Sequence, residues 1–333
     1  MKSQLYNEAK LFLDKLLTEV ETKNIDLKNY EIDHICFRVN SLDNYEKYKG
    51  IFQDFGKLLT EADVNGRPIA TYKLYEPIIH SKYLIDLIEL PAPKPGKATE
   101  EGFEHIEIVT DQTFHDLAED LKDFKLKTSG LKKDFNQELA LELDCGVIKF
   151  HHKSLEQVIQ IEEDKRIMDF IETSKVYAVL KDYEPCISGT LPLDIAHRDS
   201  DLDILFQTEN LDQFISDAKK VFGNHKDFSC RKSSHQGFDT AVINFTFKEL
   251  PVELFAQNRC VYQQQANQHF LIEGRMLKIF GEEFKKKVRK LKADGIKTEP
   301  AFGEVFQLED PYRELIEINK LSDLEISKLK TYY

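Results

Sequence analysis

The sequence predicts an α+β protein of two domains, a paired β-α-β-β-β repeat followed by a mixed sheet with C-terminal helices. Three observations lead to this prediction. The order β-α-β-β-β occurs twice in the N-terminal half, a linker rich in Pro and Gly separates the two copies, and the hydrophobic pattern changes after His152. The chain has 333 residues, which is long enough for about two domains, each with its own core.

The two copies of the repeat begin with similar strands. "DHICFRV" (Asp33–Val39) and "EHIEIVT" (Glu104–Thr110) both start with an acid, His and Ile, and then alternate apolar with polar residues. A helical stretch follows each of them, Leu42–Phe55 and Phe114–Phe124. The later strands are "RPIATYKLYEP" and "KYLIDLIELP" in the first copy, and "ELALELD" and "GVIKFHH" in the second. The linker between the copies is Pro91–Gly102.

Helices are expected on both sides of the repeat. Residues 1–20 carry apolar side chains at helical spacing, interrupted by charges, which predicts an amphipathic helix and not a signal peptide. Residues 154–183 are helical by period and contain the expected boundary between domains 1–163 and 164–333. The second domain continues with the strand "DLDILF", a helix at Leu211–Val221, the strands "TAVINFTF" and "PVELFAQ", and the helices "ANQHFLIEGRMLKIF" and "EEFKKKVRKLKADG".

The composition is that of a soluble globular protein, with 41% hydrophobic residues. A net charge of −13 argues against general binding to nucleic acids or to anionic membranes. The five cysteines are scattered and form no CxxC pair, so we expect reduced thiols and a cytoplasmic protein. No run approaches the ~18 apolar residues that a membrane span needs.

Strand alternation in the repeat gathers metal-ligand types on one face. His34 and Cys36 share a face of the first strand, and His105 and Glu107 share the matching face of its counterpart. If the copies pack as a pseudo-symmetric pair, Glu89 of the fourth strand joins them in a cup. Two imidazoles and a carboxylate suit a divalent transition metal such as Zn²⁺, Fe²⁺ or Mn²⁺. The alternative is that both His residues are half-buried and hydrogen-bonded to neighbouring carboxylates.

The N-terminal half also resembles a known family. "DHICFRV", "NGRPIATYKLYEP", "LIDLIELPAPKPG", "GFEHIEIV" and "VIKFHHKSLEQVI" are similar to the YecM-like family of the vicinal-oxygen-chelate superfamily, which includes glyoxalases and extradiol dioxygenases. The resemblance implies metal ligands at His34, Glu89 and His105. At the fourth position it aligns Lys149, which cannot ligate while protonated, and His151 on the same face could substitute. The expected cup ligands are therefore His34, Glu89, His105 and His151. Arg38 and Arg67 are candidates for binding an anionic substrate or for surface ion pairs.

The C-terminal half carries three acids on expected strands. Asp201 and Asp203 are one residue apart on "DLDILF", so both side chains project to one side. "PVELFAQ" supplies Glu253 between apolar neighbours. Adjacent carboxylates repel each other unless cations lie between them. Mg²⁺ prefers oxygen ligands and is commonly held by carboxylates together with substrate phosphates, so we expect Mg²⁺ at this point.

A turn twelve residues upstream completes the pattern. Gly189 permits close approach of the backbone, and Ser188 and Thr190 offer hydroxyls for a triphosphate. "SGTLPLDI", "SDLDILF", "PVELFAQ", "NQHFLIEGRML" and "LKADGIKTEPAF" resemble an uncharacterised bacterial family of the polymerase-beta-like nucleotidyltransferase superfamily. The resemblance implies metal ligation by Asp201, Asp203 and Glu253, and phosphate contact by Ser188, Gly189 and Thr190.

Several other polar residues, Arg275 among them, are weaker candidates. His197 and Arg198 precede the acids and could touch phosphate. His269 and Glu273 are four residues apart on an expected helix, which most simply makes them a helix ion pair. The basic run between Lys285 and Lys292 is more typical of a solvated helix face than of a phosphate site.

These observations predict a Mg²⁺-dependent transfer of a nucleoside monophosphate from an NTP to an acceptor, with a small molecule favoured by the acidic charge. Asp201, Asp203 and Glu253 are the expected catalytic residues. Two alternatives remain open. Both domains could be non-catalytic modules that bind or sense a small molecule, or the N-terminal cup could be a metal-dependent isomerase or dioxygenase.

Overall fold

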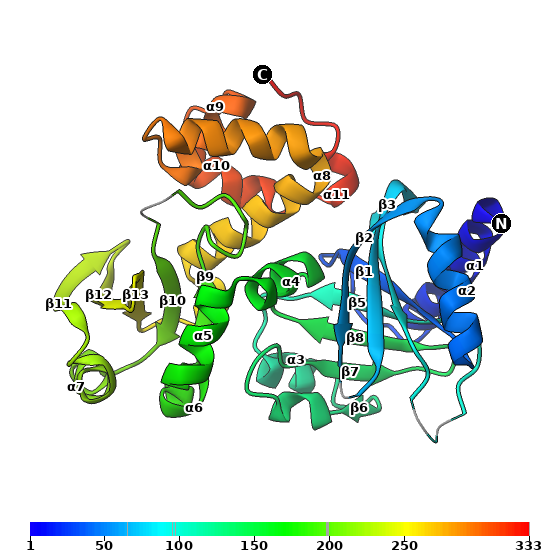
Figure 1. Ribbon diagram of the computed structural model, residues 1–333, viewed down its shortest axis with the longest axis horizontal. Helices are drawn as coiled ribbons and strands as arrows, with labels where there is room; N and C mark the ends of the chain where they lie inside the picture. The colour runs from blue at the N-terminus through cyan, green and yellow to red at the C-terminus, as the bar shows by residue number, and fades with distance from the viewer. Residues whose placement is uncertain (65, 95, 97, 198–199, 333) are drawn as a thin grey trace. The chain divides into compact units, whose positions relative to one another are not determined.

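The computed structural model describes residues 1–333 except 65, 95, 97, 198–199 and 333. The chain divides into two compact units, and the main change from one to the other lies between Leu155 and Glu156. The N-terminal unit also includes Ser322–Leu324, and the C-terminal unit includes Asp111–Thr113. Figure 1 shows the elements of both units.

The N-terminal unit is built on one eight-stranded sheet with the strand order β2-β3-β4-β1-β5-β8-β7-β6. The first copy of the repeat comprises β1 (Ile32–Arg38), α2 (Leu42–Gln53), β2 (Gly56–Asp63), β3 (Pro68–His80) and β4 (Tyr83–Pro91). The second comprises β5 (Gly102–Val109), α3 (Phe114–Asp120), β6 (Leu126–Lys127), the 3-10 turn η1 (Ser129–Lys132), β7 (Leu139–Glu142) and β8 (Val147–His151). In each copy the first and last strands pair in parallel, and β1 pairs antiparallel with β5, which joins the copies into one sheet. The expected paired β-α-β-β-β architecture is therefore confirmed.

The N-terminal helix α1 (Lys2–Thr22) packs as its sequence pattern predicts. Its buried residues recur every three or four positions, which places them on one face of the helix; they are Leu5, Ala9, Leu13, Leu16 and Val20. They belong to the same hydrophobic core as the buried residues of β1, β4 and β5. This core fixes the strands whose polar residues form the candidate metal cup.

The C-terminal unit contains a five-stranded mixed sheet with the order β11-β12-β13-β10-β9. Its strands are β9 (Cys186–Ser188), β10 (Leu202–Gln207), β11 (Lys226–His235), β12 (Phe238–Phe247) and β13 (Leu250–Gln257). Its helical elements are α4 (Leu155–Glu163), α5 (Lys165–Ser174), α6 (Val176–Val179), η2 (Lys181–Tyr183), α7 (Leu211–Phe222), η3 (Val261–Gln263), α8 (Gln265–Ala293), α9 (Thr298–Phe306), α10 (Pro311–Ile318) and α11 (Asp323–Ile326). β10 pairs in parallel with β13 and antiparallel with β9. The expected mixed sheet with C-terminal helices is confirmed.

Three details differ from the sequence expectation. The helical segment 154–183 is broken, because Asp164 caps α5 and Lys175 adopts a left-handed conformation with φ 52°. The two expected C-terminal helices are both present in α8, but they follow each other directly, separated by a kink at Gly281, whose φ of 74° is not helical. Strand β11 was not expected, since nearly all its side chains are exposed and it lacks an apolar face. It forms at the sheet edge through its ladder with β12.

Among the described residues, no helix combines the length and the apolar character that crossing a membrane requires. Nor does any pair of cysteines in this part of the chain form a disulfide.

Candidate functional site

Asp203 lies at the centre of the acidic site of the C-terminal unit. Its partner on the parallel strand β13 is Glu253, and its partner on the antiparallel strand β9 is Ser188. Residues paired in this way project from the same face of a sheet. Leu202 and Ile204, on either side of Asp203, point to the opposite face and are fully buried. The apolar residues of β10 thus fix the orientation of the acid.

Burial and mutual repulsion perturb both paired acids. Burial raises the pKa of Asp203 well above its usual range, and the negative charges of Asp201 and Glu253 raise it further. Burial also raises the pKa of Glu253; a hydrogen bond from Asn244 opposes this, and the charge of Asp201 adds to it. Asn244 Nδ2 donates to Glu253 Oε2 at 3.1 Å. Asp201 directly precedes β10 instead of lying within it, and its charge acts on both acids.

The turn after β9 lies close to the Asp203 carboxylate. Gly189 has a φ of 78°, a conformation that L side chains rarely adopt. A Cβ atom at this position would also overlap the Asp203 carboxylate. Both facts require Gly here, so the backbone of the turn approaches the acid closely. Ser188, Gly189 and Thr190 all line the cavity in front of Asp203.

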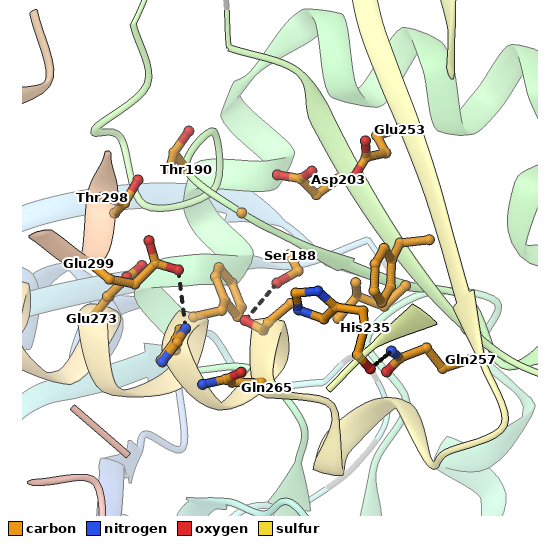
Figure 2. A pocket seen from close by; sticks show the side chains of 16 residues that line it. Ser188, Thr190, Asp203, His235, Glu253, Gln257, Gln265, Glu273, Thr298 and Glu299 are labelled. Atoms are coloured by element: carbon orange, nitrogen blue, oxygen red, sulfur yellow. Dashed lines mark hydrogen bonds and ion pairs between the residues drawn. The ribbon is translucent and has the colours of Figure 1, made fainter. Parts of the chain in front are cut away.

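The cavity has a volume of about 230 Å³, and two groups of polar residues line it. Figure 2 shows Asp203 and Glu253 at one end, Thr298, Glu273 and Glu299 at the other, and Ser188 and Thr190 between them. The remaining lining residues are Gly189, Leu205, His235, Phe255, Gln257, Gln265, Ala266, His269 and Phe270. The acidic centre therefore opens into a mixed polar and apolar pocket.

At the far end, His269 pairs with Glu299 and not with Glu273. Its Nδ1 lies 3.1 Å from Glu299 Oε1, and its Nε2 lies 2.8 Å from the carbonyl oxygen of Tyr312. Both ring nitrogens are therefore engaged by acceptor oxygens. Burial opposes ionisation of Glu299, but its hydrogen bond to His269 lowers the pKa below the usual range. The expected helix ion pair between His269 and Glu273 is wrong, because the partner of His269 comes from α9.

The other weak candidates have structural partners. Lys285 Nζ lies 2.8 Å from Asp194, and Arg289 also pairs with that residue. Lys292 Nζ donates to Thr298 Oγ1 at 2.6 Å. Arg275 donates to the carbonyl oxygens of Asn319 and Leu321 at 2.7 and 2.6 Å. His197 N donates to Ser200 Oγ, and Arg198 lies outside the described residues.

The acidic end fits a divalent cation by the chemistry of its donors. Asp203 and Glu253 offer carboxylate oxygens from paired positions of β10 and β13, and Asp201 directly precedes β10, but the three acids are not among the groups of described residues whose ligand atoms all lie within 4.8 Å of one another. Burial, and after it the charges of neighbouring acids, raises the pKa of Asp203 and of Glu253. None of the described residues that line the cavity is a Lys or an Arg. Arg231 approaches from the exposed side, with an Nη–Oε distance of 4.0 Å to Glu253. Asn244 and Arg231 were not identified from the sequence, because their proximity to Glu253 depends on the pairing of β11, β12 and β13.

In the N-terminal unit, Glu107 is the centre of the cup. Its carboxylate lies 2.7 Å from Lys149 Nζ, 2.8 Å from His151 Nε2 and 3.2 Å from His105 Nε2. His34 Nε2 lies 3.5 Å away. Burial opposes the ionisation of Glu107, but the charges of Lys149, His34 and His151 hold its pKa well below the usual range.

His34 is held in its charged form by two acids. Burial acts to lower its pKa, but the charge of Glu107 and the hydrogen bond to Asp33 raise it to about 10. Its Nδ1 lies 3.0 Å from Asp33 Oδ2. Its buried Nε2 makes no hydrogen bond with a described residue. In the charged form this nitrogen carries a proton, which a metal ion would have to displace before His34 could act as a ligand.

Two overlapping groups of the cup have ligand atoms within 4.8 Å of one another. One is His34, Glu89 and Glu107, and the other is Cys36, Glu89 and His105. Glu89 belongs to both groups, whereas His34 and His105 are in different ones. Cys36 pairs with Glu89 on β4 and with His105 on β5, which explains their proximity.

The donor set of nitrogen, oxygen and sulfur fits a borderline transition metal, and Lys149 adds a positive charge that opposes one. His151 contacts Glu107 and Asn136 and is in neither group. Cys36 and Glu107 were not selected as ligands from the sequence, although the period-two alternation places both on the cup face.

The two arginines considered for substrate binding contact the protein. Arg38 Nε lies 2.7 Å from Glu104 Oε2, and Arg67 Nη1 donates to the carbonyl oxygen of Ala92 at 2.8 Å. Glu104 also lies 2.6 Å from His105 Nδ1. Arg38 thus supports the residue that orients His105.

Two family models match consecutive parts of the chain. The model "YecM protein" matches residues 1–162, and the model "Domain of unknown function (DUF4269)" matches residues 169–318. An uncharacterised Haemophilus influenzae protein is 39% identical over 99 residues, which are 30% of this chain and 52% of that protein. Protein YecM of Escherichia coli is 33% identical over 146 residues, which are 39% of this chain and 78% of that protein. The chain thus spans about half the length of the first relative and most of the second.

Several solved structures match part of the chain. A structural-genomics protein, EC4020, is 30% identical with a TM-score of 0.43, covering 48% of this chain and 92% of that one. The Cid1 poly(U) polymerase is 16% identical with a TM-score of 0.30, covering 46% and 45%. The Streptomyces coelicolor methylmalonyl-CoA epimerase is 16% identical with a TM-score of 0.28, covering 36% and 95%. Residues 169–318 match a model of a domain of unknown function, and by its sequence match over the N-terminal half the chain belongs to the YecM family.

Proposed function

We propose that the C-terminal unit transfers a nucleoside monophosphate from an NTP to a hydroxyl group of an acceptor. The observation that carries the proposal is the position of Asp203, between Glu253 on one strand and Ser188 on the other, against the turn at Gly189. A half-buried pair of acids beside a glycine turn with hydroxyls suits a triphosphate bound with divalent cations.

Each residue has a distinct task in this proposal. The backbone N–H of Gly189 and the hydroxyls of Ser188 and Thr190 would donate hydrogen bonds to phosphate oxygens. Asp201, Asp203 and Glu253 would hold magnesium, which when bound supplies charge neutralisation for the acids and the triphosphate. The sheet holds the acids in place before substrate arrives, so little reorganisation is needed during the reaction.

The reaction is an in-line displacement at the α-phosphorus. A bond forms between the acceptor oxygen and phosphorus, and the bond from phosphorus to the pyrophosphate oxygen breaks. The hydroxyl proton passes to a carboxylate of the acidic centre, with Glu253 and Asp203 as the candidates nearest the pocket. Pyrophosphate leaves with the electron pair of the broken bond.

Label transfer tests this function. The protein is incubated with α-³²P-labelled NTPs, Mg²⁺ and a metabolite extract, and labelled products are separated from NTP. We expect transfer by the wild type and its loss in the Asp201→Asn, Asp203→Asn double variant. The exposed Asp212, which pairs with Lys232, gives the matched control Asp212→Asn. Equal transfer by the double variant and the control would falsify the proposal.

We also propose that the N-terminal cup binds a divalent transition metal. The supporting observation is the pair of ligand groups that share Glu89, together with the buried His34 Nε2. A bound metal would polarise an oxygen-rich small molecule or serve in sensing one. This candidate does not depend on transfer activity in the other unit.

Metal analysis of the purified protein tests the cup. We expect about one equivalent of a transition metal in the wild type and its loss in His34→Ala and in His105→Ala. His115 is exposed and pairs with Asp116, so His115→Ala is a suitable control. A wild type without metal, or full retention in both cup variants, contradicts metal binding at this place.

A further inference from the structure

Glu273 is a buried acid that the transfer reaction does not use. It lies on α8, is 4% exposed and lines the pocket at the end away from Asp203. Among the described residues, Oε1 has no hydrogen-bond partner. A buried carboxyl group without a partner costs free energy, so such a group commonly marks a place where a ligand binds.

Among the described residues, none forms an ion pair with Glu273, and the charge of Lys292 acts on it without a direct contact. The nearby His269 is already engaged by Glu299 and by the Tyr312 carbonyl oxygen. Lys292 is directed to Thr298 Oγ1. Burial and the charge of Glu299 raise the pKa of Glu273 well above its usual range, although the charge of Lys292 opposes this. The far end of the pocket thus has two acids and one imidazole whose two nitrogens are both engaged.

The charge of the pocket as a whole is also informative. Four acids line it, namely Asp203, Glu253, Glu273 and Glu299, and no Lys or Arg is among the other lining residues that the structure describes. The proposed magnesium and triphosphate occupy the end at Asp203 and Glu253. A second anionic group is disfavoured at the far end, whereas a cation is favoured because it pairs with Glu273. Leu205, Phe255 and Phe270 supply apolar surface for a carbon skeleton.

We propose that the acceptor is a hydroxylated small molecule with a primary ammonium group, such as an amino alcohol or an amino sugar, and that Glu273 binds this ammonium. The identification as acceptor rests on the proposed transfer function. The ion pair itself does not, because it requires neither NTP nor Mg²⁺. On binding, the ammonium gives the Glu273 carboxylate the partner that the protein does not supply.

Equilibrium binding without nucleotide tests the ion pair. The probes are glucosamine, ethanolamine and spermidine, with glucose, ethylene glycol and 1,7-heptanediol as their uncharged analogues. We expect at least one amine to bind at least tenfold more tightly than its analogue. Glu273→Gln, which keeps the size of the side chain, should remove this preference, because truncating one partner of a buried pair costs tenfold or more. Glu283→Gln on the exposed part of α8 is the control.

The outcomes separate the two proposals. Amine binding that depends on Glu273 supports the ammonium site whether or not the protein transfers label. If no amine exceeds its analogue, or if Glu273→Gln keeps the preference, the ammonium site is refuted, even where NTP transfer is observed. If Glu273→Gln fails to fold, an amine preference that is retained in the Asp201→Asn, Asp203→Asn variant supports the site at the far end, and a wild type without any preference refutes it. Loss of transfer in the Asp201→Asn, Asp203→Asn variant with amine binding retained shows that the two ends act separately.

Discussion

Asp203 and Glu253 lie directly opposite each other on the parallel strands β10 and β13, although they are far apart in the sequence. Their pairing places two carboxyl groups on one face of the sheet, where burial raises the pKa of both. Mutual repulsion in the absence of a cation follows from this geometry. The first two predictions depend on it.

Replacing Asp203 with Asn should stabilise the metal-free protein in a pH-dependent way. The folded-state pKa of Asp203 is raised above the unfolded value of 3.8, so its contribution is fully present below pH 3.8 and is lost as pH rises through the folded pKa. The advantage of Asp203→Asn should therefore grow with pH, to about 1 kcal/mol or more. Urea unfolding in EDTA, at pH values from 5 to 9 in steps of about one unit, measures the difference in free energy of unfolding between Asp203→Asn and the wild type.

Mg²⁺ should make the wild type more stable than Asp203→Asn, which is the reverse of the order expected in EDTA. The wild type should gain stability from Mg²⁺ by mass action, and Asp203→Asn should gain less. A variant that is less stable than wild type at every pH in EDTA would show that the Asp203 carboxylate is satisfied without a cation.

Adding a methyl group to the turn at Gly189 should damage the site. Gly189→Ala combines an unfavourable φ of 78° with overlap of the Asp203 carboxylate. Gly237 has a φ of 81° and open space around it, so Gly237→Ala has the backbone strain alone. We expect a loss of about 1 kcal/mol in Gly237→Ala and about 1–3 kcal/mol more in Gly189→Ala. Equal losses in urea unfolding of both variants would show that the turn is not in contact with Asp203.

Removing the positive charge of Lys149 should strengthen metal binding in the cup. Lys149 Nζ lies 2.7 Å from Glu107, a member of one ligand group. Lys149→Gln removes electrostatic repulsion of a divalent cation, and we expect roughly a tenfold rise in affinity for Zn²⁺ or Mn²⁺. Competition with a chromogenic chelator measures the affinity. Lys125, which pairs with Glu142 on the surface of the same unit, gives the control Lys125→Gln; an affinity unchanged in Lys149→Gln speaks against metal near Glu107.

His34 should contribute stability that alkaline pH removes. Its pKa is raised to about 10 in the folded protein, against 6.5 as its ordinary value. The contribution is fully present below pH 6.5 and is lost as pH rises through about 10. In EDTA, His34→Gln should therefore be less stable than wild type at pH 6. This difference in free energy of unfolding should shrink by about 1 kcal/mol or more at pH 10.5. A constant difference across this range would mean that His34 is neutral in the folded state.

Local patterns in the sequence were sufficient for much of the architecture. The acid-His-Ile strands of the repeat and the alternation around Asp203 and Glu253 are readable because strand periodicity depends only on neighbouring residues. The same periodicity put Cys36 and Glu107 on the cup face, but it could not say which members of that face come within ligand distance. Strand β11 left no such pattern, because an exposed edge strand needs no apolar face.

The sequence by itself determined the two-domain α+β organisation, the twofold repeat and the acids of β10 and β13, since hydrophobic alternation and turn residues specify them locally. The tertiary structure decided which polar groups meet: Glu107 with three imidazoles and Lys149, His269 with Glu299, and Glu273 with no counter-ion. These contacts are between residues of separate strands and helices. They depend on register and packing, which no local pattern encodes.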